Sequence, residues 1–235
     1  MIDNTLENNV VNIVGRISTK LEFSHEIYGE GFYSFILEIP RLSQNYDKVP
    51  IMVSERLMEL DTLGIGAFIE VQGQFRSYNT AEGENHRLLL TVFARDIIFL
   101  EEILNVKNPN KIYLNGFVCK KPIYRTTPFG REICDLLVAV NRAYYKSDYI
   151  PCICWGRNAR FSEGLKLGDN IKLWGRVQSR DYQKKLENGE VKSNIAYEMS
   201  VSKMEMISEN KHEIEEKELF ELKDEFQNKD SVESL

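Results

Sequence analysis

The sequence has no long apolar segment and no segment with the pattern of an export signal. No apolar run approaches the ~20 residues that a membrane-spanning helix needs. The first twelve residues, MIDNTLENNVVN, are polar and acidic and lack the basic-then-apolar order of a secretory signal peptide. Both absences predict a protein that stays inside the cell. With 43% hydrophobic and 28% charged residues among 235, the chain suits one or two globular domains.

Metal ligands are scarce and badly spaced. The four cysteines include no C-x-x-C pair, and the three histidines are scattered and lie far from them. This spacing disfavours a structural zinc site, and inside a cell the cysteines are expected to stay reduced. The residues concerned are Cys119, Cys134, Cys152 and Cys154, with His25, His86 and His212.

Signatures of catalysis are absent from the sequence as well. There is no glycine loop that would cradle a phosphate, no Cys-His or Ser-His constellation, and no carboxylate cluster suited to two metal ions. We therefore expect a protein that is not an enzyme and that uses no cofactor.

A tandem duplication organises the chain. Residues of the first half recur in the second half at an offset of 101, and one insertion then moves the offset to 102. The segment LGIGAFIEVQGQFRSY (63–78) falls on LKLGDNIKLWGRVQSR (165–180). An offset that persists through so many glycine and proline positions indicates two copies of one domain. The matched pairs include Gly15 and Gly116, Asp47 and Asp148, Pro50 and Pro151, Gly66 and Gly168, Gly73 and Gly175, and Ser77 and Ser179.

Each copy is a series of short segments rich in β-branched and aromatic residues, which predicts strands. In the second copy a helical stretch, 158–165, can separate the third and fourth strands, and Asn188-Gly189 is a strong hairpin signal between the last two. Five strands with a helix after the third predict an OB barrel, with an unrelated small barrel or sandwich as the alternative. The predicted strands are 112–119, 133–142, 149–155, 170–178 and 195–206.

The repeat also predicts the domain boundaries. We expect an all-β chain of two tandem five-stranded OB barrels, 1–104 and 109–208, with 100–111 as linker and 209–235 as an acidic tail that is helical or disordered. The first segment to residue 108 holds 9 Lys and Arg against 16 Asp and Glu, a net of −7. The second holds 17 against 10, a net of +7, and the tail 4 against 10, a net of −6. A polyanion would prefer the second copy, although uneven decoration of a solvated surface would give the same charges.

Aromatic residues accompany the positive charge of the second copy. Proteins that bind single strands need ring faces on which bases stack, each worth ~1–3 kcal/mol, beside cations that follow the phosphates. In SDYIPCICWG (147–156), alternation along a strand puts Tyr149 and Trp155 on one face and Cys152 and Cys154 on the other. Because free cysteine is a small, well-buried hydrophobe, we expect the cysteines inside the barrel and both aromatics outside.

Several of the remaining candidates also have an ordinary structural explanation. Trp174 is as well suited to a core or a subunit contact, only one of Tyr144 and Tyr145 is expected to stack, and Lys184 could simply solvate a hairpin. The residues assigned to a single-strand binding surface are Tyr144, Tyr149, Trp155, Trp174, Tyr182, Arg125, Arg131, Arg142, Lys146, Arg157, Arg176, Arg180 and Lys184.

Two stretches of the second copy, 116–159 (GFVCKK to WGRNA) and 165–201 (LKLGDN to YEMSV), resemble the bacterial single-stranded DNA-binding protein family in motif order. The resemblance covers essentially all of this copy. It implies that aromatics of the third strand, of the loop before it and of the last hairpin stack on bases. On this sequence those roles fall on Tyr149, Trp155, Tyr144 or Tyr145, and Tyr182.

The resemblance also carries expectations about assembly. The family forms assemblies of four OB domains, which a tandem chain would reach as a homodimer. Its members usually end in an acidic tip that docks replication and repair proteins, whereas this chain ends in SVESL after a charged segment with helical tendency. The tail is therefore either a partner-binding helix or a solvated extension. The implied location is cytoplasmic and nucleoid-associated.

The first copy departs from the family in its binding residues. At the repeat offset, Ser54 replaces Trp155 and Lys48 replaces Tyr149. We expect this copy to supply chiefly an assembly or protein-contact surface, although four aromatics could still offer a stacking face. These are Phe32, Tyr33, Phe75 and Tyr78.

Taken together, the sequence predicts sequence-tolerant binding and protection of single-stranded DNA in replication, recombination or repair. An accessory OB protein of a primosome or of mobile-element replication is a close alternative, with DNA as one partner among several. The sequence is also compatible with a protein scaffold built on the acidic copy and tail, and with a protein that binds RNA.

Overall fold

The computed structural model describes residues 7–57, 64–82, 85–101, 106–185 and 191–207. Residues 1–205 form one compact unit, which contains both copies of the repeat. Residues 206–235 form a second unit, of which only the first two residues are described. The expected acidic tail and the Asn188-Gly189 turn therefore lie outside the described residues.

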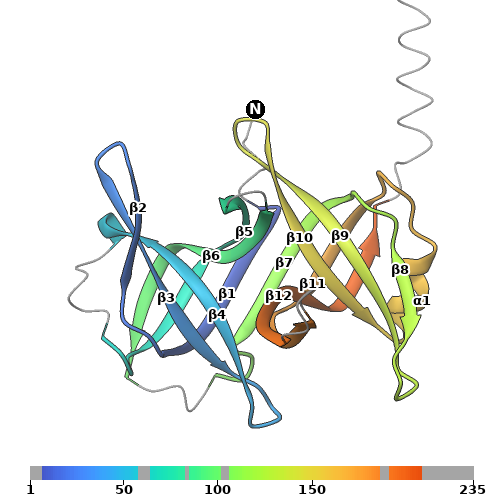
Figure 1. Cartoon of the computed structure of the whole chain (residues 1–235), viewed down its shortest axis with the longest axis horizontal. Coiled ribbons are helices and arrows are strands. Elements are labelled where there is room, and N and C mark those ends of the chain that lie inside the picture. The colour runs from blue at the N-terminus through green and yellow to red at the C-terminus, as the bar shows by residue number, and fades with distance from the viewer. Residues whose placement is uncertain (1–6, 58–63, 83–84, 102–105, 186–190, 208–235) are drawn as a thin grey trace, which may run out of the picture. The chain divides into compact units, whose positions relative to one another are not determined.

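The second copy is built from five long strands, one short strand and one helix (Figure 1, green to red). All five expected strands are present, and the expected helix lies between the third and fourth of them. The short strand β8 was not foreseen, because its four residues are mostly exposed and show no apolar alternation. The elements are β7 (Asn110–Val118), β8 (Ile123–Thr126), β9 (Glu132–Arg142), β10 (Lys146–Trp155), α1 (Arg157–Glu163), β11 (Asn170–Lys185) and β12 (Val191–Met206).

The first copy repeats this order of strands, and a 3-10 turn follows its third long strand (Figure 1, blue to green). Its last strand ends at Leu100 and β7 begins at Asn110, so the linker is slightly shorter than the predicted 100–111. The elements are β1 (Asn9–Ile17), β2 (Glu22–Ile27), β3 (Glu30–Pro40), β4 (Tyr46–Ser54), η2 (Glu55–Leu57), β5 (Phe68–Glu82) and β6 (Asn85–Leu100).

Each copy closes into a barrel through one parallel pairing. In the first copy β4 pairs with β6 in parallel, with Ile51 opposite Val92, and in the second β10 pairs with β12, with Cys152 opposite Met199. The remaining pairings are antiparallel, and β1–β3 and β7–β9 complete the two circuits. Two tandem OB barrels, the fold class predicted from the sequence, are thereby confirmed.

Strands β1 and β7 join the two barrels in one continuous sheet of twelve strands. They pair antiparallel from Asn9 opposite Leu114 to Ile13 opposite Asn110. Since the repeat offset here is 101, Val11 opposite Ile112 is the centre of an approximate two-fold relation. The chain therefore contains within itself the kind of self-complementary contact that two identical subunits form.

Alternation along the strands fills both barrels with aliphatic side chains. In β10, Ile150, Cys152 and Cys154 are buried, as the alternation predicted. Burial raises the pKa of the Cys154 thiol to about 12 and that of Cys134 to about 11, so both thiols stay protonated at neutral pH. In the part of the chain that the structure describes, no three His, Cys, Asp or Glu side chains gather where they could hold a metal ion, and no helix is long and apolar enough to cross a membrane.

Candidate nucleic-acid interface

Strand β10 presents two aromatic side chains at the surface of the second barrel. Tyr149 is 44% exposed and Trp155 is 38% exposed, whereas the residues of opposite parity between them are buried. Ile153 lies between the two aromatics on the outer face but is only 4% exposed. The two rings are therefore available to solvent, separated by a covered stretch of the same strand.

The residues on the strands beside Trp155 are small or aliphatic. Trp155 pairs with Ile133 on β9, and Ser200 of β12 lies opposite the preceding outward residue, Ile153. Beyond Trp155, Arg157 begins α1 and is exposed, and Arg160 pairs with Glu132 at 3.1 Å.

The first barrel fills the same place in the opposite way. Ser54, which replaces Trp155, lies on β4 opposite Phe32 of β3. The ring of Phe32 approaches that of Phe93, on the other neighbouring strand β6, to 5.8 Å. The Ser54 hydroxyl donates to the carboxylate of Glu30, which also pairs with Arg56 at 3.3 Å. On the first barrel, this outer face therefore carries packed aromatic rings and the carboxylate of Glu30.

This packing corrects part of the expectation for the first copy. Phe75 is 0% exposed and Phe32 is 8% exposed, so neither can accept a base, and the prediction that they offer a stacking face is wrong. Phe75 points into the barrel, and Phe32 is covered by the ring of His25, 5.0 Å away and nearly parallel. Tyr33 and Tyr78 remain partly exposed.

The hairpin between β9 and β10 carries two further aromatics at its tip. Tyr144 is 90% and Tyr145 108% exposed, and both adopt positive φ angles of 60° and 56°. Such angles are uncommon for bulky residues and here belong to the turn that joins the two strands. On β11, Tyr182 is 39% exposed.

Trp174 occupies a different setting from Trp155. Its ring lies 5.2 Å from that of Tyr113, and the ammonium group of Lys203 lies 4.5 Å from its centroid. The side chain is only partly exposed. Its packing on neighbouring strands agrees with the structural role that the sequence left open, and a stacking role for it stays a prediction.

The basic residues of the predicted surface divide into free and paired side chains. Arg125 pairs with Asp135 at 2.9 Å and Arg180 with Glu198 at 3.4 Å. Arg131, Lys146 and Arg157 are exposed, and the structure shows no ion pair for them among the described residues. The side chain of Lys184 lies outside the described residues.

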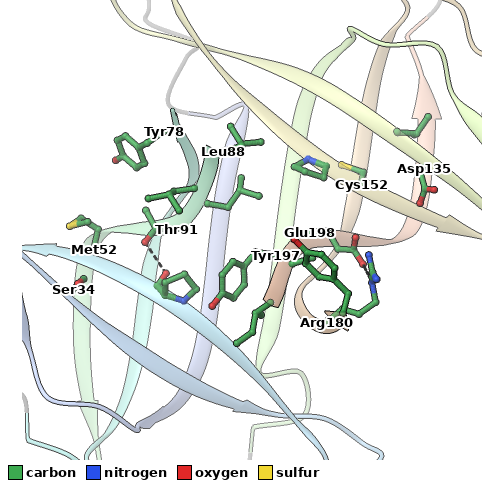
Figure 2. A pocket seen from close by; sticks show the side chains of 18 of the residues that line it. Ser34, Met52, Tyr78, Leu88, Thr91, Asp135, Cys152, Arg180, Tyr197 and Glu198 are labelled. Carbon is green, nitrogen blue, oxygen red and sulfur yellow. Dashed lines mark hydrogen bonds and ion pairs between the residues drawn. The ribbon is translucent and has the colours of Figure 1, made fainter. Parts of the chain in front are cut away.

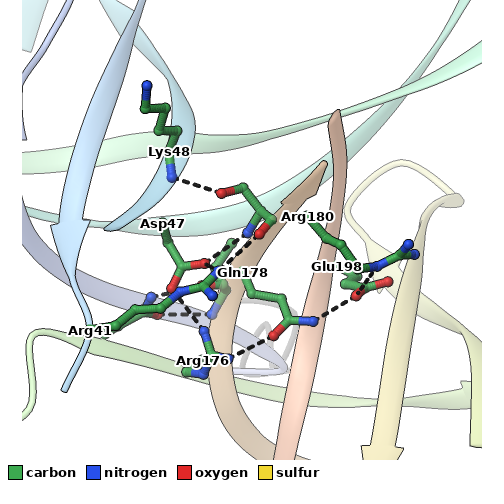
Figure 3. A network of polar contacts seen from close by, with 10 residues as sticks. Arg41, Asp47, Lys48, Arg176, Gln178, Arg180 and Glu198 are labelled. Atoms are coloured by element: carbon green, nitrogen blue, oxygen red, sulfur yellow. Dashed lines mark hydrogen bonds and ion pairs between the residues drawn. The ribbon is translucent and has the colours of Figure 1, made fainter. Parts of the chain in front are cut away.

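The two remaining arginines lie at the boundary between the barrels, each in a cluster around a buried aspartate. In the Asp47 cluster, Arg176 of the second barrel donates to the Asp47 carboxylate at 2.8 Å, and Arg41 of the first barrel donates to its other oxygen (Figure 3). The amide of Ser179 donates to the same carboxylate at 2.9 Å. This hydrogen bond from Arg41 to Asp47 raises the pKa of the guanidinium.

The Asp148 cluster is the repeat-related counterpart. Asp148 accepts from Arg142 at 3.3 Å and from the amide of Ser77 at 2.8 Å, and the amide of Tyr149 donates to the Ser77 hydroxyl at 2.8 Å. One carboxylate oxygen of Asp148 is buried without a hydrogen-bond partner. Burial raises the pKa of this carboxyl, although the Ser77 amide and the arginines oppose the shift.

A groove of about 1140 Å³ lies between the barrels and is lined by both copies (Figure 2). Its walls hold repeat-related pairs, such as Pro50 with Pro151 and Tyr78 with Arg180. Arg125 and Tyr182 of the predicted set also line it. The groove thus brings together three predicted residues, whereas Tyr149 and Trp155 lie on the outer face of β10 and are not among its lining residues.

Sequence reasoning missed the boundary clusters. The matched pairs Asp47 with Asp148 and Ser77 with Ser179 were visible as repeat positions, but nothing in the sequence said that each aspartate meets the serine of the other copy. The signal that could have found them is that both copies keep an aspartate and a serine at equivalent positions of the repeat. Arg76, which lies beside the Asp148 cluster, was missed because it belongs to the acidic copy.

Residues 109–207 match the model of the single-strand binding protein family. This match confirms the resemblance that the sequence of the second copy indicated. Single-stranded DNA-binding protein 1 of Staphylococcus aureus (strain COL) is 35% identical over 81 residues, which are 32% of this chain and 48% of that protein. Single-stranded DNA-binding protein A of Bacillus subtilis (strain 168) is 33% identical over 81 residues, 32% of this chain and 47% of that protein. The chain thus spans about half the length of these relatives.

The similarity to solved structures extends over both barrels. The wild-type single-stranded DNA binding protein from Thermus aquaticus has a TM-score of 0.67 to this chain and 18% sequence identity. The comparison covers 86% of this chain and 94% of that one. At this identity the likeness establishes a shared fold, with two barrels in tandem.

Proposed function

We propose that this chain, whose second barrel matches the single-strand binding protein family, binds single-stranded DNA with little regard to sequence. The observation that carries the proposal is the exposed pair Tyr149 and Trp155 on a barrel with a net charge of +7. Bases stack on the rings, and the exposed cations Arg131, Lys146 and Arg157 follow the phosphates. The process served is replication, recombination or repair of DNA.

The proposal extends to assembly. A chain with two barrels reaches four OB domains as a homodimer, and the tail is the segment proposed to contact replication or repair proteins. The first barrel contributes chiefly contact surface, since Glu30 and Ser54 occupy the place that corresponds to the exposed tryptophan. A cytoplasmic, nucleoid-associated location belongs to the same proposal.

A titration with three nucleic acids tests the function. The full chain is mixed with oligo-dT, oligo-U and duplex DNA at several salt concentrations while tryptophan emission is followed. Stacking predicts quenching by single strands, little change with duplex, and an affinity that falls as salt rises. Binding of oligo-U as tight as that of oligo-dT would favour RNA as the natural ligand.

A single substitution locates the stacking surface. Trp155→Ala should weaken oligo-dT binding by ~1–3 kcal/mol if the indole stacks on a base. Phe117→Ala is the matched control, because it removes a similarly exposed aromatic side chain from the same barrel at a position outside the predicted set, and should leave the affinity nearly unchanged. Equal affinities of wild type and the Trp155 variant would move the site elsewhere, and no binding by the wild type would favour the scaffold function.

A further inference from the structure

The repeat exchanges one arginine and one glutamine between its copies. Arg176 and Gln178 of the second copy occupy the positions of Gln74 and Arg76 in the first. Arg176 donates to Gln178 at 2.8 Å and reaches the Asp47 carboxylate. Arg76 donates to Gln74 at 3.0 Å, but among the described residues it forms no ion pair with a carboxylate.

The charge of Arg76 is therefore poorly compensated. Its guanidinium lies 4.1 Å from the centroid of the Phe93 ring, and its Nε is buried without a hydrogen-bond partner. Burial, followed by the like charge of Arg142, lowers the pKa of Arg76, whereas Tyr78 and Asp148 oppose the shift. A partly buried cation whose hydrogen-bonding and ring partners are neutral is stabilised by any anion that can reach it.

The residue that follows Arg76 contacts a proposed stacking residue. Arg76 directly precedes Ser77, whose hydroxyl accepts from the amide of Tyr149 at 2.8 Å. The first barrel thus holds in place the backbone of an aromatic that belongs to the second. At the Asp47 cluster, Lys48 stands in the place of Tyr149. Arg41 and Arg176 both donate to Asp47 there. Among the described residues, only the Asp148 cluster has both an arginine without an ion pair and an exposed aromatic at or beside it.

We propose that Arg76, although it belongs to the acidic first barrel, binds a backbone phosphate of the strand whose base stacks on Tyr149. Arg142 is the neighbouring cation, and two arginines around the single carboxylate of Asp148 leave a net positive site at the boundary. The strand then crosses from the second barrel onto the first. This inference rests on the proposed function and adds to it a contact from the copy that has lost the family's aromatics.

The salt dependence of oligo-dT binding tests the contact. Each phosphate neutralised on a single strand contributes a slope of about −0.7 to log K against log salt concentration. Arg76→Gln should reduce the magnitude of the slope by about 0.7 and should leave the quenching at saturation unchanged. Arg95→Gln is the matched control, because it removes the same charge from an exposed position of the same barrel, and should leave the slope as in the wild type.

Two further measurements separate a phosphate contact from a packing role. Arg76→Lys keeps the charge and should retain the wild-type slope; a loss as large as that of Arg76→Gln would overturn the proposal. Should Arg76→Gln not fold, modification of the wild-type arginines by phenylglyoxal decides, since bound oligo-dT must protect Arg76. Equal slopes for the Gln variants at 76 and 95, or an unprotected Arg76, refute this inference alone, whereas failure of the wild type to bind refutes the proposed function.

Discussion

Single residues account for the division of labour between the two copies. In the second copy the small Ser200 lies on the strand beside Trp155, whereas in the first copy Phe93 takes the place of Ser200 and packs against Phe32. The large side chain on this face, Trp155 or Phe93, is therefore exposed in the second barrel and packed against another ring in the first. The repeat glycines have an equally local reason: a Cβ added at Gly175 would overlap the carbonyl oxygen of Ser200.

Gly175→Ala should therefore destabilise the fold through steric overlap. The closest atom is backbone, which cannot rotate away, and overpacking of this kind costs about 1–3 kcal/mol. Gly164→Ala is the control, since a Cβ there meets only ordinary contact with Phe161 and the φ of −81° suits any residue. Urea unfolding of both variants measures the difference; equal midpoints would show that the barrel adjusts at β12.

At the scale of elements, strand β10 combines a buried thiol face with an exposed aromatic face. Cys154 is directly opposite Cys134 on β9, and both thiols keep their protons well above the ordinary thiol pKa of 9.0 because they are buried. Between pH 9 and about 11–12 the unfolded chain releases protons that the folded chain retains. These thiols contribute stability that is complete below pH 9 and is lost as pH rises through the folded-state values.

Comparison with Cys154→Ala isolates this contribution. Between about pH 8 and pH 10.5 the free energy of unfolding should fall more steeply for the wild type than for the variant, because the other titrating groups are common to both. Urea midpoints at a series of pH values provide the measurement. Parallel curves would mean that ionisation of Cys154 is not coupled to folding.

The sequence predicted the elements of the second barrel well because alternation and turn chemistry are local properties. Five strands, the helix and the inward cysteines followed from patterns within about ten residues of one another. Relations between the copies were out of reach, since pairing of β1 with β7 and the contact of Ser77 with Asp148 depend on how two barrels dock. For the same reason Arg142 and Arg176 were assigned to a surface, although both lie in boundary clusters.

At the scale of the whole molecule, the two boundary clusters depart from the approximate two-fold relation, because their aspartates have different numbers of arginine partners. Asp47 accepts from two arginines, and Asp148 from one, with its second carboxylate oxygen left unpaired. Removing one partner of a buried ion pair is strongly destabilising because the other charge is left uncompensated, whereas a buried charge that lacks partners is itself costly. The two aspartates should therefore respond differently to the same substitution.

Asp47→Asn should lower the free energy of unfolding by about 3–5 kcal/mol, because two arginines lose their carboxylate. Asp148→Asn should cost clearly less near neutral pH, because burial raises the pKa of this carboxyl and ionising it in the folded state is unfavourable. The folded-state pKa is raised, so the stability linked to Asp148 is complete below the unfolded-state pKa and is lost as pH rises through the folded-state value. Urea unfolding at about pH 5 and pH 7 measures both effects: the difference between wild type and Asp148→Asn should shrink or change sign at the higher pH. Equal costs for the two variants would show that the boundary is electrostatically symmetric despite its unequal hydrogen bonds.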